Sequence, residues 1–226
     1  MTGRADGRDV RRRLTLSLIA LLALAGTAAA RNPHDPQRRF TKADQAWAKK
    51  LVVTRADLTG AGWTAERTSS NATCRSFNPD ESDLIETGER ESPGFSRNGS
   101  FVASMAAVFR SSAHAQSAWA REIRPALLKC LAEGLDMSST PGTSVAIVSQ
   151  GRMAFTKLAP RTAAFKVRLV FTVQTFTLRA DVHVIALGRG RANLMLVTMS
   201  PGRPLSPLPV GLERTLAQRL AQRLRG

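Results

Sequence analysis

Three stretches of alternating apolar and polar residues place the strongest constraint on the fold. Residues 101–110, 165–174 and 178–187 carry apolar side chains at every second position, the period of a half-buried β-strand. In residues 165–174 the outward positions are partly basic. The sequence Gly-Arg-Gly-Arg at 188–191 is typical of a tight hairpin turn, after which residues 192–199 can pair back. These patterns predict an antiparallel sheet.

Helical patterns lie before, between and after these strands. Thr41 can cap a first helix, and Ser111 or Ser112 can cap a long helix that ends near Gly134 and is bent by Pro125. A stripe of leucines over residues 212–224 predicts a final helix. The expected fold class is therefore α+β, with an antiparallel sheet packed on one side by helices in a two-layer sandwich.

The first 30 residues have the three parts of a secretory signal. Three consecutive arginines run into the apolar stretch Leu14–Ala25, and small residues follow as far as Ala30. We expect cleavage after Ala30. The alternative is an uncleaved membrane anchor, since the apolar stretch 14–30 reaches the short limit of a membrane span, which needs about 20 residues. Either interpretation predicts a secreted or extracytoplasmic protein.

The remaining chain divides into a tether and one domain. Two prolines and mixed charges predict a flexible tether over residues 31–40, followed by a single domain over 41–226. The chain has two cysteines, Cys74 and Cys130, at a spacing that fits no zinc site. In an exported chain such a pair predicts a disulfide, which in the chain-entropy account stabilises the fold by roughly 4 kcal/mol. The predicted fold class therefore includes one disulfide.

The chain is strongly basic. It has 33 Lys and Arg against 17 Asp and Glu, and without the first 30 residues the counts are 28 and 15, a net charge of +13. One interpretation is a surface for anionic partners such as teichoic-type polymers or lipid head groups. The other is a compositional bias towards arginine, because the basic residues are spread along the chain. Nucleic acid is an unfavoured partner, since the chain has no Tyr for base stacking and is expected to be exported.

The sequence contains no catalytic motif, metal-ligand cluster or nucleotide-binding loop, which predicts a non-enzymatic protein without cofactors or metals. Asp181 and His183 share one face of a predicted strand, and a His oriented by an Asp is part of a hydrolase triad. No nucleophile completes the set, so an exposed polar ladder is the alternative. The acidic residues within 80–91 predict a solvated loop or, less directly, a calcium site. The candidate pocket or core residues are Trp63, Phe101, Trp119 and Phe171.

A looser pattern extends over most of residues 55–224. It consists of the entry Asp57-Leu58 to Gly62-Trp63, Cys74 in a polar loop, the strand end Ala107-Val108-Phe109-Arg110 before Ser112 and Ala115, Cys130 on the long helix, a late strand pair and a final helix. In this outline the chain resembles exported actinobacterial envelope proteins, namely the extracellular sensor domain of a mycobacterial Ser/Thr kinase and related small envelope lipoproteins. The resemblance implies a bacterial envelope ligand-binding or interaction module. It supplies no catalytic residues. The kinase domain has two disulfides, whereas this chain can form only one.

Taken together, these patterns predict an exported, non-enzymatic cell-envelope binding or sensor-like domain. Its ligand would be an envelope component or a small molecule held between the sheet and a helix. Two alternatives stay open. One is a secreted hydrolase that uses Asp181 and His183, and the other is a basic surface protein that binds anionic envelope polymers.

Overall fold

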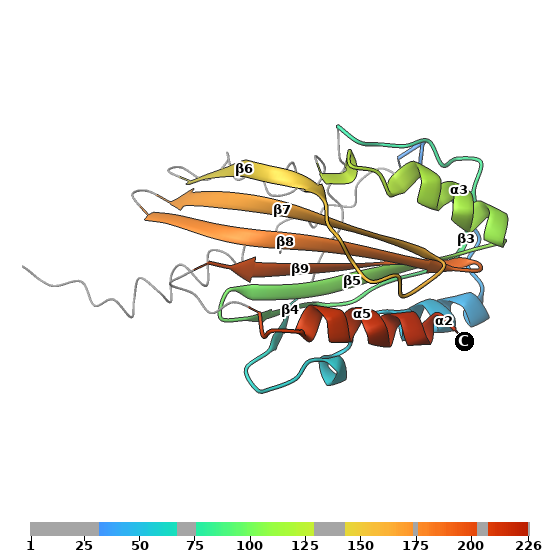
Figure 1. Ribbon diagram of the computed structural model, residues 1–226. Helices are drawn as coiled ribbons and strands as arrows, with labels where there is room; N and C mark the ends of the chain where they lie inside the picture. The colour runs from blue at the N-terminus through green and yellow to red at the C-terminus, as the bar shows by residue number, and fades with distance from the viewer. Residues whose placement is uncertain (1–31, 67–75, 129–142, 174–175, 203–207, 226) are drawn as a thin grey trace, which may run out of the picture.

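A nine-stranded mixed sheet forms the framework of the protein in a computed structural model (Figure 1). The model describes residues 32–66, 76–128, 143–173, 176–202 and 208–225. The strands are β1 (Gln37–Arg38), β2 (Thr64–Glu66), β3 (Ile85–Glu91), β4 (Gly94–Arg97), β5 (Ser100–Phe109), β6 (Thr143–Arg152), β7 (Arg161–Val173), β8 (Phe176–Arg189) and β9 (Ala192–Pro201). The helices are α2 (Lys42–Leu51), the 3-10 helix η1 (Arg55–Asp57), α3 (Ser112–Glu122) and α5 (Leu212–Arg223).

The strand order is β1-β3-β5-β9-β8-β7-β6, and β4 joins β2 to β5 beside this path. All pairs are antiparallel except β1 with β3, which run parallel with Gln37 opposite Ile85. The predicted all-antiparallel sheet is therefore wrong in this one pairing. The segment expected as a tether supplies β1, because the backbone N–H of Gln37 donates to the carbonyl of Leu84 at 2.8 Å and that of Arg39 to Glu86 at 2.8 Å.

Helices cover both faces of the sheet, which corrects the predicted two-layer sandwich with helices on one side. Strand β8 shows the reason, because its buried residues alternate between two core clusters. Ile185 and Leu187 pack with α2 and α5 on one face. Val184 and Ala186 face the other cluster, which Ile123 and Leu128 enter from the end of α3 and the turn that follows it. A strand buried on both faces lacks simple alternation, and residues 184–187 are accordingly all apolar.

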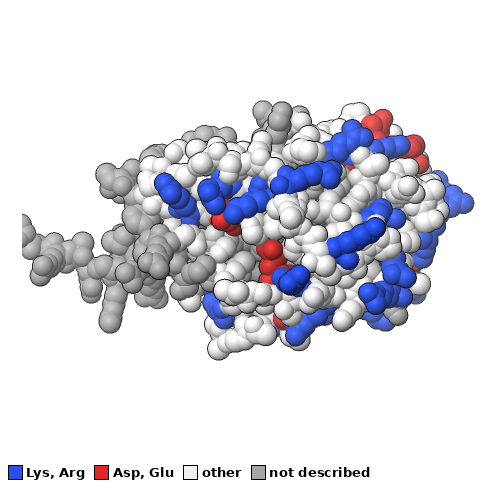
Figure 2. All heavy atoms as spheres, in the orientation of Figure 1, with Lys and Arg blue, Asp and Glu red and all other residues white. Residues whose placement is uncertain are grey.

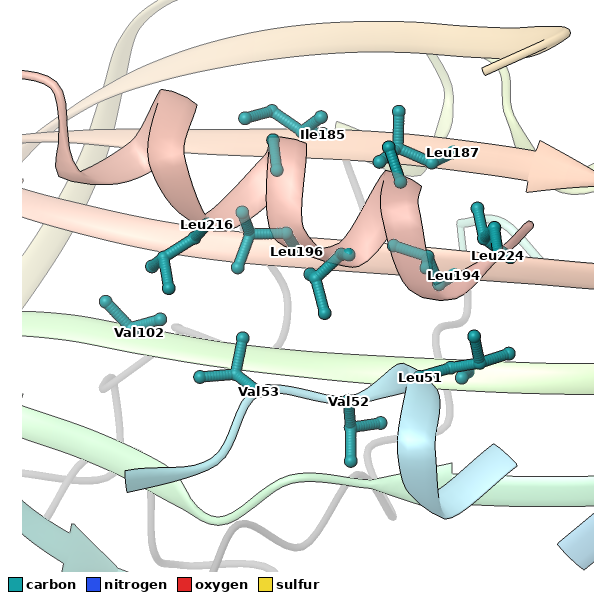
Figure 3. Close-up of a cluster of buried hydrophobic side chains, with 14 of the residues drawn as sticks. Leu51, Val52, Val53, Val102, Ile185, Leu187, Leu194, Leu196, Leu216 and Leu224 are labelled. Atoms are coloured by element: carbon teal, nitrogen blue, oxygen red, sulfur yellow. The ribbon is translucent and has the colours of Figure 1, made fainter. Parts of the chain in front are cut away.

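The first cluster lies between α5 and the sheet (Figure 3). Leu194 and Leu196 of β9 meet Leu216 and Leu224 of α5, and the residues that end α2 close the side of the cluster (Figure 3). Figure 1 shows α5 running along β5 and β9. The leucine stripe predicted for residues 212–224 is thus confirmed as the buried face of a helix.

Two predicted helix starts are confirmed, and one predicted helix is interrupted before Pro125. The Thr41 side chain accepts from the backbone N–H of Asp44 at the start of α2, and Ser111 does the same for His114 at the start of α3. Helix α3 ends at Glu122, three residues before Pro125, and Leu127 and Leu128 are again helical; the predicted end near Gly134 lies outside the described residues. Proline lacks the N–H that a continuing helix needs, so the chain turns there instead.

The predicted disulfide is not part of the described structure. Cys74 and Cys130 are the only cysteines of the chain, and both lie outside the described residues. The fold class is therefore corrected to an α+β protein with a mixed sheet between helices and no disulfide among the described residues. The predicted signal segment also lies outside these residues.

Candidate functional site

Positive and negative side chains are distributed differently before strand β6 and from β6 to the end of α5. The described residues from β6 to α5 contain 12 Lys and Arg but only two carboxylates, those of Asp181 and Glu213. The described residues before β6 contain 11 of each kind. The excess positive charge of the described protein therefore lies on β6 to β9, their connections and α5. Figure 2 shows a row of Lys and Arg side chains across the sheet beside α5.

The sheet register places several of these cations together. Lys166 lies opposite His183, and Arg168 lies opposite Asp181, so all four side chains point to the face that α5 partly covers. Arg179, two residues before Asp181 on β8, points to the same face. Residues two apart on a strand are separated by about 7 Å, so Lys166 and Arg168 are spaced along β7, and Arg179 follows on β8 opposite Val170. We call these five residues the basic face.

Asp181 binds the two β7 cations at once. Its Oδ2 lies 3.0 Å from Nζ of Lys166, and its Oδ1 accepts from Nε of Arg168 at 2.9 Å. Burial alone would raise the pKa of Asp181, but the hydrogen bonds from Arg168 and Lys166 outweigh it and bring the pKa below its ordinary value. All three side chains keep about a third or more of their surface in solvent. Such exposed pairs contribute only about 0–1 kcal/mol each to stability.

His183 pairs with a residue far from it in sequence, not with Asp181. Its Nδ1 lies 2.7 Å from Oε2 of Glu213 in the first turn of α5, and the same oxygen accepts from the Thr198 hydroxyl at 2.7 Å. Burial favours a higher pKa for Glu213, but the hydrogen bonds from His183 and Thr198 bring the pKa below its ordinary value. Nε2 of His183 is buried and has no partner among the described residues. This arrangement fixes the start of α5 on the sheet and keeps the free ring nitrogen away from solvent.

The two residues of the hydrolase alternative thus belong to different ion pairs. Sequence reasoning identified Asp181, His183 and the basic outer face of β7, but it missed Glu213 and Thr198. Spacing alone carries no signal for Glu213, which lies 30 positions from His183 and reaches it only because α5 packs back on the sheet.

The candidate aromatic residues belong mainly to the core. Trp63, Phe101 and Phe171 are all buried, Trp63 in the cluster beneath α5 and the two phenylalanines in the opposite cluster. Trp119 on α3 is partly buried against that opposite cluster, and the Arg161 guanidinium lies 5.9 Å from its ring centre. Of the two interpretations, pocket or core, the packing of the three buried rings fits the core.

The acidic residues within 80–91 form the predicted solvated loop only in part, since Asp80 and Asp83 are exposed while the others lie partly or fully buried. Glu81 and Glu86 are buried, and burial, with repulsion from neighbouring carboxylates, raises the pKa of Glu86 to about 8. Burial also raises the pKa values of Glu81 and Glu122, and the charge of Glu122 raises the pKa of Glu81 further. No three His, Cys, Asp or Glu side chains among the described residues are grouped so that they could hold a metal ion.

Comparison of the chain with protein-family models finds no match, and comparison with curated proteins finds none either. Within the described part of the chain, no helix combines the length and apolar character needed to cross a membrane.

Proposed function

We propose that this protein is an exported, non-enzymatic binding module of the cell envelope that takes an anionic ligand on its basic face. The observation that carries the proposal is the charge division: 12 cations from β6 to α5 stand against two carboxylates, and three of these cations pair with Asp44 or Asp57 from earlier in the chain. A surface of one charge sign raises the local concentration of oppositely charged partners and speeds their association.

The β7 cations suit such a ligand because they are ordered but weakly held. Asp181 fixes the positions of Lys166 and Arg168, which reduces the side-chain entropy lost on binding. Their ion pairs with Asp181 are exposed and weak, so a ligand phosphate or carboxylate can replace part of that contact. The two negative charges of Asp181 and Glu213 are smaller than the combined charge of Lys166, Arg168 and Arg179, and the face stays basic.

The geometry of His183 supports binding over catalysis at this face. A general base must reach a substrate proton directly or through one water, and Nε2 of His183 is buried. Its other nitrogen is bound to Glu213, which holds α5 in place. The hydrolase alternative needs Asp181 beside His183, and Asp181 is bound to Lys166 and Arg168 instead.

The proposal is tested with inorganic polyphosphate as the anionic probe. Binding to the purified protein is measured by fluorescence anisotropy over a series of NaCl concentrations, with wild type compared to a triple variant Lys166→Ala, Arg168→Ala, Arg179→Ala. We expect wild-type affinity to fall steeply with salt, and the triple variant to bind at least about tenfold more weakly at low salt.

The matched control is the triple variant Lys42→Ala, Lys49→Ala, Lys50→Ala, which removes the same charge from exposed positions on or beside α2. It should change the affinity by no more than about twofold. Equal losses in the two triple variants would show that net charge alone attracts the probe. Either that result or salt-independent binding would overturn the proposal.

A further inference from the structure

The outermost strand, β6, carries small side chains at the positions in register with the cation-bearing side of β7, and the exposed Val148 sits at the bulge between Ile147 and Ser149. Register places Gly151 opposite Lys166 and Ser149 opposite Arg168, and Ala146 and Ser144 continue the same side. Ser144, Ala146 and Ser149 are exposed, and Gly151 is half-buried. The cations of β7 are therefore open to approach across β6.

The fold does not require a glycine at position 151. A Cβ built there meets no atom within 4 Å, and the backbone does not have the positive φ that favours glycine. Glycine within a strand is destabilising by roughly 0.5–1 kcal/mol relative to alanine. A strand glycine that neither packing nor backbone geometry requires often marks a close approach by a ligand or another chain. Here that approach would end at Lys166.

The opposite side of the basic face is bounded by α5. Glu213 in its first turn binds His183, and Arg214 donates from Nη2 to the Thr156 hydroxyl at 2.8 Å, which ties α5 to the connection between β6 and β7. A helix with its side chains is about 10 Å thick, so α5 stands well above the sheet. A flat membrane would meet α5 before it reached Lys166, whereas a single extended chain fits between α5 and the low side at β6.

We propose that the ligand of the basic face is a linear polyanion, a chain of repeated phosphodiester or carboxylate groups that lies along β7 and approaches across β6. The proposal rests on the proposed function of the basic face. The charges of the polyanion would meet Lys166 and Arg168 along β7, at the spacing of about 7 Å that alternate strand residues provide, and then Arg179, which lies on the neighbouring strand β8 opposite Val170.

The test blocks the approach without changing any charge. Gly151→Ile adds a branched side chain next to Lys166, and Ile147→Phe adds bulk to the opposite face of the same strand, where Ile147 is exposed and opposite Leu169. We expect Gly151→Ile to weaken binding of inorganic polyphosphate about tenfold and Ile147→Phe to leave it within about twofold. Thermal unfolding by circular dichroism checks that both variants fold. If Gly151→Ile does not fold, Ser149→Leu is used instead to add bulk on the same side of β6.

The outcomes separate the two proposals. If Gly151→Ile binds polyphosphate as wild type does while the Lys166, Arg168 and Arg179 variant is weakened, the approach across β6 is wrong and the basic face stands. If neither variant changes binding, both proposals fall. Phosphatidylglycerol vesicles at the same phosphate concentration should bind more weakly than polyphosphate, and equal or tighter vesicle binding would identify a membrane surface as the partner and overturn the polymer proposal.

Discussion

Glu86 offers a sharp test of the electrostatics because a single buried carboxyl should control how stability changes with pH. It is 5% exposed on β3, and burial raises its pKa to about 8, with repulsion from Glu89 adding to the effect. Arg38 acts in the opposite direction, but its Nε lies 3.9 Å from the carboxylate and its side chain is half exposed. Glu122 and Asp35 also face this group and raise the pKa further.

The sign and size of the pH dependence follow from the difference between the pKa of Glu86 in the folded and in the unfolded protein. The folded pKa lies above the ordinary value of 4.5, so the folded protein keeps a proton that the unfolded chain releases. Stability from this group is complete below pH 4.5 and declines as pH rises towards 8. At 1.36 kcal/mol per pH unit, the loss is about 3 kcal/mol at pH 7 and approaches about 5 kcal/mol by pH 9.

The perturbation is Glu86→Gln, which keeps the shape of the side chain and removes the titration. Urea unfolding followed by tryptophan fluorescence should give the variant and the wild type the same free energy of unfolding at pH 4.5, within about 1 kcal/mol. At pH 7 to 8 the variant should be more stable by an amount on the order of 3 kcal/mol. Asp83→Asn is the contrasting control, because its hydrogen bond from Arg121 lowers the pKa of Asp83 and the sign of the pH dependence is reversed.

If the free energies of unfolding of the wild type and Glu86→Gln change with pH in parallel between pH 4.5 and 8, this reasoning is refuted. A variant that loses the same stability at every pH would mean that Glu86 is ionised in the folded protein and stabilises it through Arg38. The same measurement on Glu89→Gln should show a smaller effect of the same sign, because burial also raises the pKa of Glu89 while Arg38 lies 3.2 Å from it.

Two further predictions concern fixed contacts. Asp57→Ala should lower the free energy of unfolding at pH 7 by about 3 kcal/mol in urea titrations, because buried Asp57 binds Arg223 and the Thr54 backbone N–H. Its pKa lies below the ordinary value, since those hydrogen bonds outweigh burial, so the difference should shrink as pH falls to about 3. Gly88→Ala should be destabilising by about 2 kcal/mol or more in the same assay, since its Cβ would lie 2.5 Å from the Asp44 carbonyl.

The long strands and the helix starts could be predicted because their signals are local. Residues 178–187 and 192–199 fall within β8 and β9, which are joined through Gly190 and Arg191, and both predicted caps accept their expected hydrogen bonds. The side chain of Arg191 then binds Asp44, 147 positions earlier in the chain, a contact with no sequence pattern. Sequence periodicity and capping residues predict strands and helices, whereas contacts between distant residues are set only when the chain has folded.

Strand β3 was missed for a physical reason. Its sequence Ile-Glu-Thr-Gly-Glu-Arg-Glu has the composition of a loop, yet most of the strand is buried or half-buried. The fold accepts Glu86 there because the carboxyl can be protonated, a state that composition does not reveal. The helices on both faces were missed as well, although the unbroken apolar run 184–187 was a visible signal of a strand covered twice.

The contact between Asp57 and Arg223 has a consequence for how the chain folds. It joins residues 166 positions apart, and Arg219 adds a hydrogen bond to the carbonyl of Asp57 at 2.9 Å. The core cluster beneath α5 therefore closes only when α5 meets η1 and the end of α2, where Arg223 also donates to the carbonyl of Val52 at 2.8 Å. Contacts this distant in sequence slow folding, because the entropy of a long loop is lost before the contact forms. The core cluster beneath α5 of a nascent chain would therefore stay open until α5 has been synthesised.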